Sequence, residues 1–173
     1  MPRPDLSRVP VYFHNYINQV PEDDLLESFR KQSEVFIQFL ESIPPDKYDY
    51  RYADGKWTLK ELLQHIIDAE RIFSYRALRF ARKDATPLAS FDENSFTLHS
   101  KAGNRNWKDL VDEFKSVRKS SQYLFNSFDN EQLNASGVSN NNSIYVLGIG
   151  FITIGHTLHH KKIIEERYLK ASK

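Results

Sequence analysis

Residues 58–82, TLKELLQHIIDAERIFSYRALRFAR, predict a long amphipathic helix that must pack against other helices. Thr58 and Glu61 have the spacing of a capping box, in which the hydroxyl accepts from the Glu61 amide and the carboxylate reaches back. Apolar side chains then recur at steps of three and four, as one face of a helix requires. That face also carries His65, among Leu62, Ile66, Ala69, Ile72 and Phe73. A helix with one apolar face is stable when that face is buried, so the stretch predicts a helical bundle.

Three further stretches, 22–42, 107–128 and 143–169, have the same periodicity, and proline and glycine fall between them. Four helices of about 20 residues predict an all-α, four-helix bundle in a single domain, residues 1–173. A connection at 83–106 and an Asn/Ser-rich linker at 134–143 are long for a compact domain. We therefore expect one crossover rather than simple up-down-up-down winding. Residues 1–20 are expected to form an N-terminal extension or a short helix.

The composition is that of a globular chain and excludes several classes of site. Hydrophobic residues make up 40% of the chain and aromatic residues 13%, enough for a packed core. The absence of cysteine excludes disulfides, thiolate nucleophiles, zinc–thiolate sites and iron–sulfur clusters. A formal net charge of +1 provides no broad surface for nucleic acid or an anionic membrane. Because there is no signal-peptide core and no apolar run of about 18 residues, we expect a soluble cytoplasmic protein.

Residues 155–168, GHTLHHKKIIEERY, place three histidines within five positions of the last predicted helix. His156 and His160 lie one turn apart and share their face with Tyr145, Ile149, Ile152 and Ile163. Both therefore point to the core, where we expect them to converge with His65 from the second helix. Buried imidazoles need partners, and a divalent metal ion satisfies one nitrogen of each. Three ligands leave a position for water, whose pKa the ion lowers, as in catalytic rather than structural sites.

The residues alone leave a plainer alternative open, because a histidine on an apolar face is usually a hydrogen-bonded core residue. Their spacing does exclude two classes of metalloenzyme. HTLHH has Thr157 where the zincin motif has its glutamate. Glu61 and His65 are four residues apart, whereas the Glu-x-x-His pair of di-iron bundles has a spacing of three.

Three stretches together resemble the DinB-like proteins, also described as YfiT-like metal-dependent hydrolases: YADGKWTLKELLQHIIDAERIFSYRALRFARKD, FDEN and GHTLHHKKIIEERYL. The resemblance covers most of residues 25–169 and is most specific at the second and fourth helices. It implies a four-helix bundle in up-down-down-up order, with a divalent metal, nickel or zinc in many members, held by three histidines. Carried over by position, these ligands are His65, His156 and His160. The activities known in the family are largely those of low-molecular-weight-thiol S-transferases or isomerases. The family is labelled "damage-inducible", which describes its regulation and implies no DNA-binding surface.

Four further polar residues are candidates around such a site. Asp68 would orient a ligand imidazole through a hydrogen bond, although an exposed helix charge is the slightly favoured alternative. His159 departs from the three-ligand pattern, and we expect it to support the ligands or the fold. Arg76 and Arg79, with Arg82, form a cationic stripe on the second helix. The stripe either clamps the carboxylates of a thiol cosubstrate or pairs with neighbouring acids, and pairing is favoured.

The leading prediction is a metal-dependent enzyme that acts on a small molecule, by thiol-dependent S-transfer or by hydrolysis. A non-catalytic metal- or ligand-binding module of a stress response is the alternative, and no protein base is identified. The last helix also carries a second apolar stripe opposite its histidines, formed by Leu147, Phe151, Ile154 and Leu158. Either other elements of the chain or a second chain must cover this stripe, so a homodimer is a further prediction.

Overall fold

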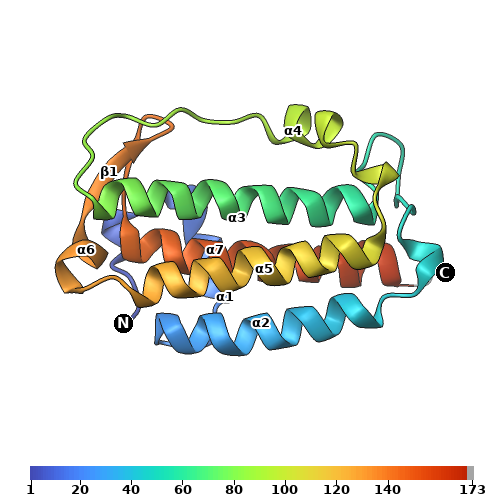
Figure 1. The fold of residues 1–173 in the computed structure, drawn as a ribbon, viewed down its shortest axis with the longest axis horizontal. Coiled ribbons are helices and arrows are strands. Elements are labelled where there is room, and N and C mark those ends of the chain that lie inside the picture. Colours follow the sequence, from blue (N-terminus) through green and yellow to red (C-terminus); the bar gives the residue numbers. More distant parts are fainter. Residues whose placement is uncertain (171–173) are drawn as a thin grey trace.

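Four long α-helices form a bundle in the computed structural model, which describes residues 1–170 (Figure 1). They are α2 (Leu25–Ser42), α3 (Leu59–Ala81), α5 (Trp107–Asn126) and α7 (Val146–Ile163), which a π-helix, Ile164–Leu169, extends. The chain runs along the bundle in α2, returns in α3, runs parallel to α3 in α5 and reverses in α7. This is the predicted up-down-down-up order, with the crossover between α3 and α5. The last three residues of the predicted domain lie outside the described residues.

Short elements join the long helices. The predicted N-terminal helix is α1 (His14–Gln19), and the connection 83–106 contains α4 (Glu93–Ser100) beside α3. A further short helix, α6 (Asn130–Asn134), follows α5. Single 3-10 turns occupy Leu6–Arg8, Val11–Phe13, Pro45–Lys47 and Ala102–Asn104.

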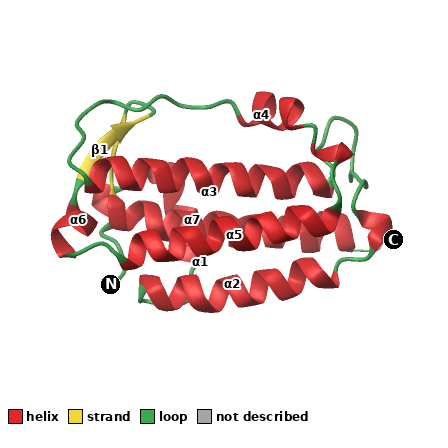
Figure 2. Cartoon of the chain, viewed as in Figure 1, coloured by secondary structure: helices red, strands yellow, loops and turns green. Residues whose placement is uncertain are grey.

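The predicted linker at 134–143 is largely a β-hairpin, which corrects the sequence prediction. Strands β1 (Ser136–Ser139) and β2 (Asn142–Tyr145) pair antiparallel at the end of the bundle where α3 finishes and α7 starts (Figure 2). The two residues between them, Asn140 and Asn141, have φ of 50° and 59°. Asparagine tolerates this left-handed conformation, which a two-residue hairpin turn requires. The hairpin also explains why the last helix begins at 146 and not at the predicted 143.

Side-chain caps set the starts of the helices. Before α3, the Thr58 hydroxyl accepts from the Glu61 amide at 3.2 Å, and the Glu61 carboxylate accepts from the Thr58 amide at 2.7 Å. The predicted capping box is therefore present, and such a cap contributes about 1 kcal/mol. Before α2, Asp24 accepts from the Glu27 amide at 2.9 Å. That cap places the start of the first long helix three residues later than the predicted residue 22.

The second apolar stripe of the last helix is covered within the chain. Leu147, Phe151 and Ile154 are buried, and α7 contacts α1, α2 and α3. The backbones of α1 and α7 lie very close together at Gly155, because a Cβ added there would lie 2.0 Å from the backbone oxygen of Tyr16 in α1. The stripe therefore needs no second chain to bury it.

A buried ion pair joins three of the long helices. Arg118 of α5 donates from Nε and Nη2 to the Glu70 carboxylate of α3 at 2.8–3.0 Å, and its Nη2 donates to the Thr157 hydroxyl of α7 at 2.8 Å. The two charged side chains are only 1% and 2% exposed. Because each charge is paired and hydrogen-bonded, burial is tolerated. The pair holds α7 in register with α3 next to His156.

None of the helices in the described part of the chain combines the length and hydrophobicity that a membrane span requires.

Candidate metal centre

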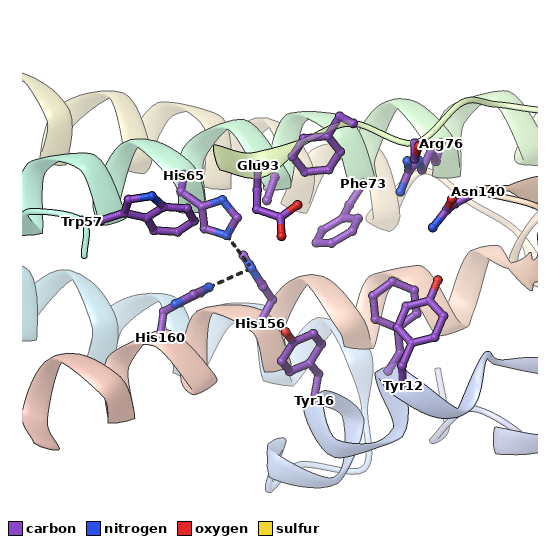
Figure 3. A pocket seen from close by; sticks show the side chains of 14 residues that line it. Tyr12, Tyr16, Trp57, His65, Phe73, Arg76, Glu93, Asn140, His156 and His160 are labelled. Carbon is purple, nitrogen blue, oxygen red and sulfur yellow. Dashed lines mark hydrogen bonds between the residues drawn. The ribbon is translucent and has the colours of Figure 1, made fainter. Parts of the chain in front are cut away.

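Three histidines from two helices meet inside the bundle (Figure 3). His65 comes from the second turn of α3, and His156 and His160 come from successive turns of α7. The Nε2 atom of His156 lies 3.1 Å from Nε2 of His65 and 3.0 Å from Nε2 of His160. One ring nitrogen of each lies within 4.8 Å of those of the other two. The structure thus brings together the three residues that helical spacing predicted would converge.

The surrounding side chains hold the three rings in place. The Tyr16 ring packs edge-on against His156, and the Trp57 ring lies 4.8 Å from the ring of His65. Tyr16 reaches this position because Gly155 lets α1 approach α7 closely. The Nδ1 atom of His160 is buried with no hydrogen-bond partner among residues 1–170. At Nδ1, therefore, packing rather than a hydrogen bond orients this ring, and its only contact of hydrogen-bond length among residues 1–170 is that of Nε2 with His156.

Burial keeps the three imidazoles neutral. It lowers the pKa of His65 to about 4, with the Glu93 carboxylate acting in the opposite direction. It also lowers the pKa of His156 and His160 well below 6.5, and the neighbouring imidazoles lower both further. Neutral imidazole is the form that donates a lone pair to a metal ion. The three imidazoles therefore need not lose a proton before they can bind a metal ion near neutral pH.

The contacts among the three Nε2 atoms fit a bound cation better than they fit hydrogen bonds. Each neutral nitrogen is either a donor or an acceptor with one lone pair, so a single N–H···N bond uses two nitrogens and leaves the third without a partner. A divalent ion accepts all three lone pairs. Tetrahedral zinc with Zn–N bonds of 2.0–2.1 Å separates its ligand nitrogens by about 3.3 Å. The separations of 3.0 and 3.1 Å are close to that value.

The histidine cluster forms part of the wall of a cavity of about 460 Å³. Aromatic rings of Trp57, Tyr16 and Phe73 line it beside the cluster. Two charged side chains also reach it: Glu93 near the histidines, and Arg76 towards the other end (Figure 3). A cavity with mainly apolar walls and a few polar groups is typical of a small-molecule site.

Glu93 was not among the residues predicted for the site. It is the first residue of α4, which the Asp92 side chain caps by accepting from the amides of Asn94 and Ser95. Because α4 packs beside α3, the Glu93 carboxylate points towards the space in front of the histidines (Figure 3). The Asp92 cap signal was present in FDEN, but only the tertiary arrangement shows which way the following side chain points.

Two further candidates, Asp68 and His159, make no hydrogen bond to the three rings in the described part of the chain, and Asp68 lines a separate pocket. Asp68 accepts from Gln64 at 2.9 Å and lies 3.7 Å from Arg71. Burial raises the pKa of this carboxyl. The half-buried ring of His159 packs against Tyr16 and against the ring of His160. His159 thus supports a cluster ring through packing.

The predicted cationic stripe divides into two kinds of residue. Arg79 makes an ion pair with Asp84 and donates to the Tyr75 hydroxyl, as the favoured pairing alternative expected. Arg76, one turn earlier on α3, is buried in the cavity wall and donates from Nη2 to the backbone oxygen of Ala89 at 3.0 Å. The two arginines therefore have different roles despite their spacing.

Together the fold and the cluster define a class of protein: a four-helix bundle in which buried histidines open onto a ligand-sized cavity. The sequence profile of the DinB superfamily matches residues 28–164, so the chain belongs to that superfamily. No curated protein sequence matches the chain.

Solved structures have the same fold. YfiT from Bacillus subtilis, described as a probable metal-dependent hydrolase with an unusual four-helix bundle topology, superimposes with a TM-score of 0.70 at 15% identity, over 94% of this chain and 89% of that chain. A mycothiol-dependent maleylpyruvate isomerase superimposes with a TM-score of 0.66 at 9% identity, over 92% of this chain and 62% of the isomerase. A mutant of that isomerase gives a TM-score of 0.67 at 9% identity, over 98% of this chain and 64% of that one. The chain thus spans somewhat less than two thirds of the isomerase's length.

Proposed function

We propose that this protein is a metal-dependent enzyme in which His65, His156 and His160 hold one divalent ion at the wall of a small-molecule cavity. The observation that carries the proposal is the convergence of three neutral Nε2 atoms, two of them 3.0 and 3.1 Å from the third, with no other partner that could satisfy all three. Neutral imidazole ligands suit zinc and nickel, which we propose as the ion. The three ligands are too few for the closed, four-ligand sphere of a structural zinc site.

The ion would supply Lewis acidity, activating a bound water or thiol or polarising an electrophilic substrate. The chain itself would supply the environment. The rings of Trp57 and Phe73 would form apolar walls beside the cluster. The Glu93 carboxylate, which faces the same space, is positioned to accept a proton from a nucleophile held there. Reaction types proposed for this site are hydrolysis and thiol-dependent transfer, and the second needs an external thiol because the chain has no cysteine.

Metal analysis tests the ligand assignment. Protein purified without an affinity tag is expected to contain about one divalent ion per chain, and His156→Ala is expected to lose it. His99→Ala is the matched control, because within residues 1–170 the exposed His99 ring contacts only Ser95 on its own helix, where Nδ1 donates to the backbone oxygen at 2.8 Å and lies 3.5 Å from the hydroxyl. Metal retained by the His156 variant, or lost equally from both variants, would disprove the assignment.

Activity measurements separate the enzyme from the non-catalytic alternative. We expect metal-dependent conjugation of a model electrophile with one of a panel of small thiols, or metal-dependent hydrolysis of a model ester. Stoichiometric metal without turnover in either assay would favour a metal- or ligand-binding module. The homodimer and the cytoplasmic location stay predictions, and analytical ultracentrifugation tests the first.

A further inference from the structure

One buried arginine, Arg76, has no carboxylate partner among residues 1–170. Arg76 is 8% exposed, lines the cavity and donates one hydrogen bond, to the Ala89 backbone oxygen. Within the described part of the chain it forms no ion pair. Arg118 is the internal comparison, because it is also buried, at 1% exposed, but has the Glu70 carboxylate and the Thr157 hydroxyl as partners. The fold thus provides a counter-charge for one buried guanidinium and leaves the other exposed to the cavity.

A guanidinium with one neutral acceptor is energetically unfavourable in the interior. It carries five N–H donors and stays charged at any physiological pH, so removal from water has to be offset by several charged or polar partners. Burial lowers the pKa of Arg76. A purely structural role, in which Arg76 only ties the segment before α4 to α3 through Ala89, would use one of the five donors. An anionic ligand in the cavity would use the remaining ones.

A second unpartnered donor lies beside this arginine. The Ser139 hydroxyl, on β1, is buried without a hydrogen-bond partner among residues 1–170. Ser139 and Arg76 together line a small recess that adjoins the main cavity, with Tyr12 and Phe73 common to both. The neighbouring Asn140 lines the main cavity and points into it near Arg76 (Figure 3). The recess of about 10 Å³ has room for one water molecule, which could link the Ser139 hydroxyl to a ligand held by Arg76.

Backbone pairing fixes this end of the cavity. Leu88 donates to the Val138 oxygen at 2.9 Å, and Asn140 donates to the Leu88 oxygen at 3.0 Å. The segment before α4 is therefore attached to the hairpin, and Ala89 follows directly to accept from Arg76. The donors are held in position before any ligand arrives, which reduces the entropy lost on binding.

We propose that Arg76, beside Asn140, forms an anion subsite in the cavity, so that the ligand of this cavity is an elongated organic anion whose carboxylate or phosphate lies far from its reacting atom. The inference rests on the proposed function for the position of the reacting atom, at the histidine cluster. Along α3, His65 and Arg76 are separated by roughly 16 Å at 1.5 Å per residue. The aromatic walls between them suit an apolar middle part. Glu93 near the histidines disfavours the reverse orientation, because its carboxylate would face the anionic group.

Binding to the metal-free protein tests the subsite without the metal. Hexanoate, hexyl phosphate and hexanol are titrated by NMR, so that both anion chemistries are compared with an uncharged chain of the same length. At least one anion is expected to bind about tenfold or more tightly than hexanol, the effect of a charge-assisted pair. Arg76→Met is expected to abolish this advantage and Arg76→Lys to retain part of it. The matched control is Arg79→Met, which removes an arginine of the same helix that is paired with Asp84.

A second experiment connects the subsite with the histidine cluster. The zinc-loaded protein is titrated with ω-mercapto acids of increasing length and with the corresponding ω-mercapto alcohols, whose thiolates bind zinc. The advantage of acid over alcohol is expected to peak at one chain length and to disappear in Arg76→Met. An anion advantage that survives Arg76→Met in the metal-free protein would overturn the subsite, and an advantage independent of length would overturn its connection to the cluster. Failure to load zinc would instead refute the proposed function, while the first experiment still decides the subsite.

Discussion

Acid is expected to destabilise the metal-free protein through its histidine cluster. Because burial lowers the pKa of His65 to about 4, the folded protein keeps this imidazole neutral in a pH range where the unfolded chain, with a pKa of 6.5, protonates it. Proton uptake by the unfolded state favours unfolding. The stabilisation is therefore complete above pH 6.5 and is lost as the pH falls towards about 4. His156 and His160, with pKa values lowered in the same direction, add to the loss.

The size of the effect follows from the two pKa values of His65. Their separation of about 2.5 corresponds to roughly 3 kcal/mol in the free energy of unfolding, at 1.36 kcal/mol for each pH unit. This is a large fraction of the 5–15 kcal/mol that typically stabilises a domain. The loss from one residue should therefore be visible well before the protein unfolds completely.

Urea denaturation of the metal-free protein, followed by circular dichroism between about pH 7 and pH 4, measures this loss. The matched variant is His65→Gln, which has no group that titrates in this range. The unfolding free energy of the wild type minus that of the variant is expected to fall by roughly 3 kcal/mol across the range. Zinc should raise the wild-type value near neutral pH and have no effect near pH 4, because protons compete for the imidazoles. A difference between the two proteins that does not change with pH would refute the reasoning.

Two further substitutions test how the fold positions the site. Glu70→Gln removes the charge opposite Arg118 and is expected to cost about 3–5 kcal/mol in urea denaturation, whereas Glu70→Leu combined with Arg118→Met should recover much of this by leaving no buried charge. Gly155→Ala should cost about 2 kcal/mol or more, because its Cβ would lie 2.0 Å from a backbone oxygen of α1. Gly103→Ala, which meets nothing within 4 Å, is the control, and equal losses in the two glycine variants would contradict the close-approach argument.

The long helices and the cluster could be predicted from the sequence because both depend on local periodicity. The capping box at Thr58 and the apolar repeat determine where α3 starts and which side chain faces the core. Once His65 and the pair His156 and His160 are each on a buried face, convergence requires only that the two helices pack together. In a bundle of only four long helices most pairs of helices are neighbours, so these two helices are expected to pack together.

The remaining features depend on the segments that connect the long helices, and the sequences of these segments have no periodic hydrophobic pattern. The hairpin at β1 and β2 depends on two asparagines with positive φ, and the Asn/Ser-rich composition around them also fits an irregular linker. The direction of Glu93 depends on where the crossover places α4. Arg76 and Arg79 have the same residue type on the same helix. Their surroundings differ because the connection after α3 places Asp84 beside Arg79 and the backbone oxygen of Ala89 beside Arg76.

The two ends of the cavity are built from different kinds of structure, and this difference has a consequence for function. The histidine end is carried by α3 and α7, which pack against each other along their length and are joined through the ion pair of Arg118 with Glu70. Helices packed in this way hold ligand atoms to the small tolerances that metal coordination requires. The opposite end combines Arg76 and Phe73 of α3 and Tyr12 of an N-terminal 3-10 turn with the hairpin and the segment before α4, and the last two are joined by a few backbone hydrogen bonds. Under the proposed function, changes in these connections are expected to alter which anion binds without moving the imidazoles, so selectivity for the ligand and affinity for the metal would be separable.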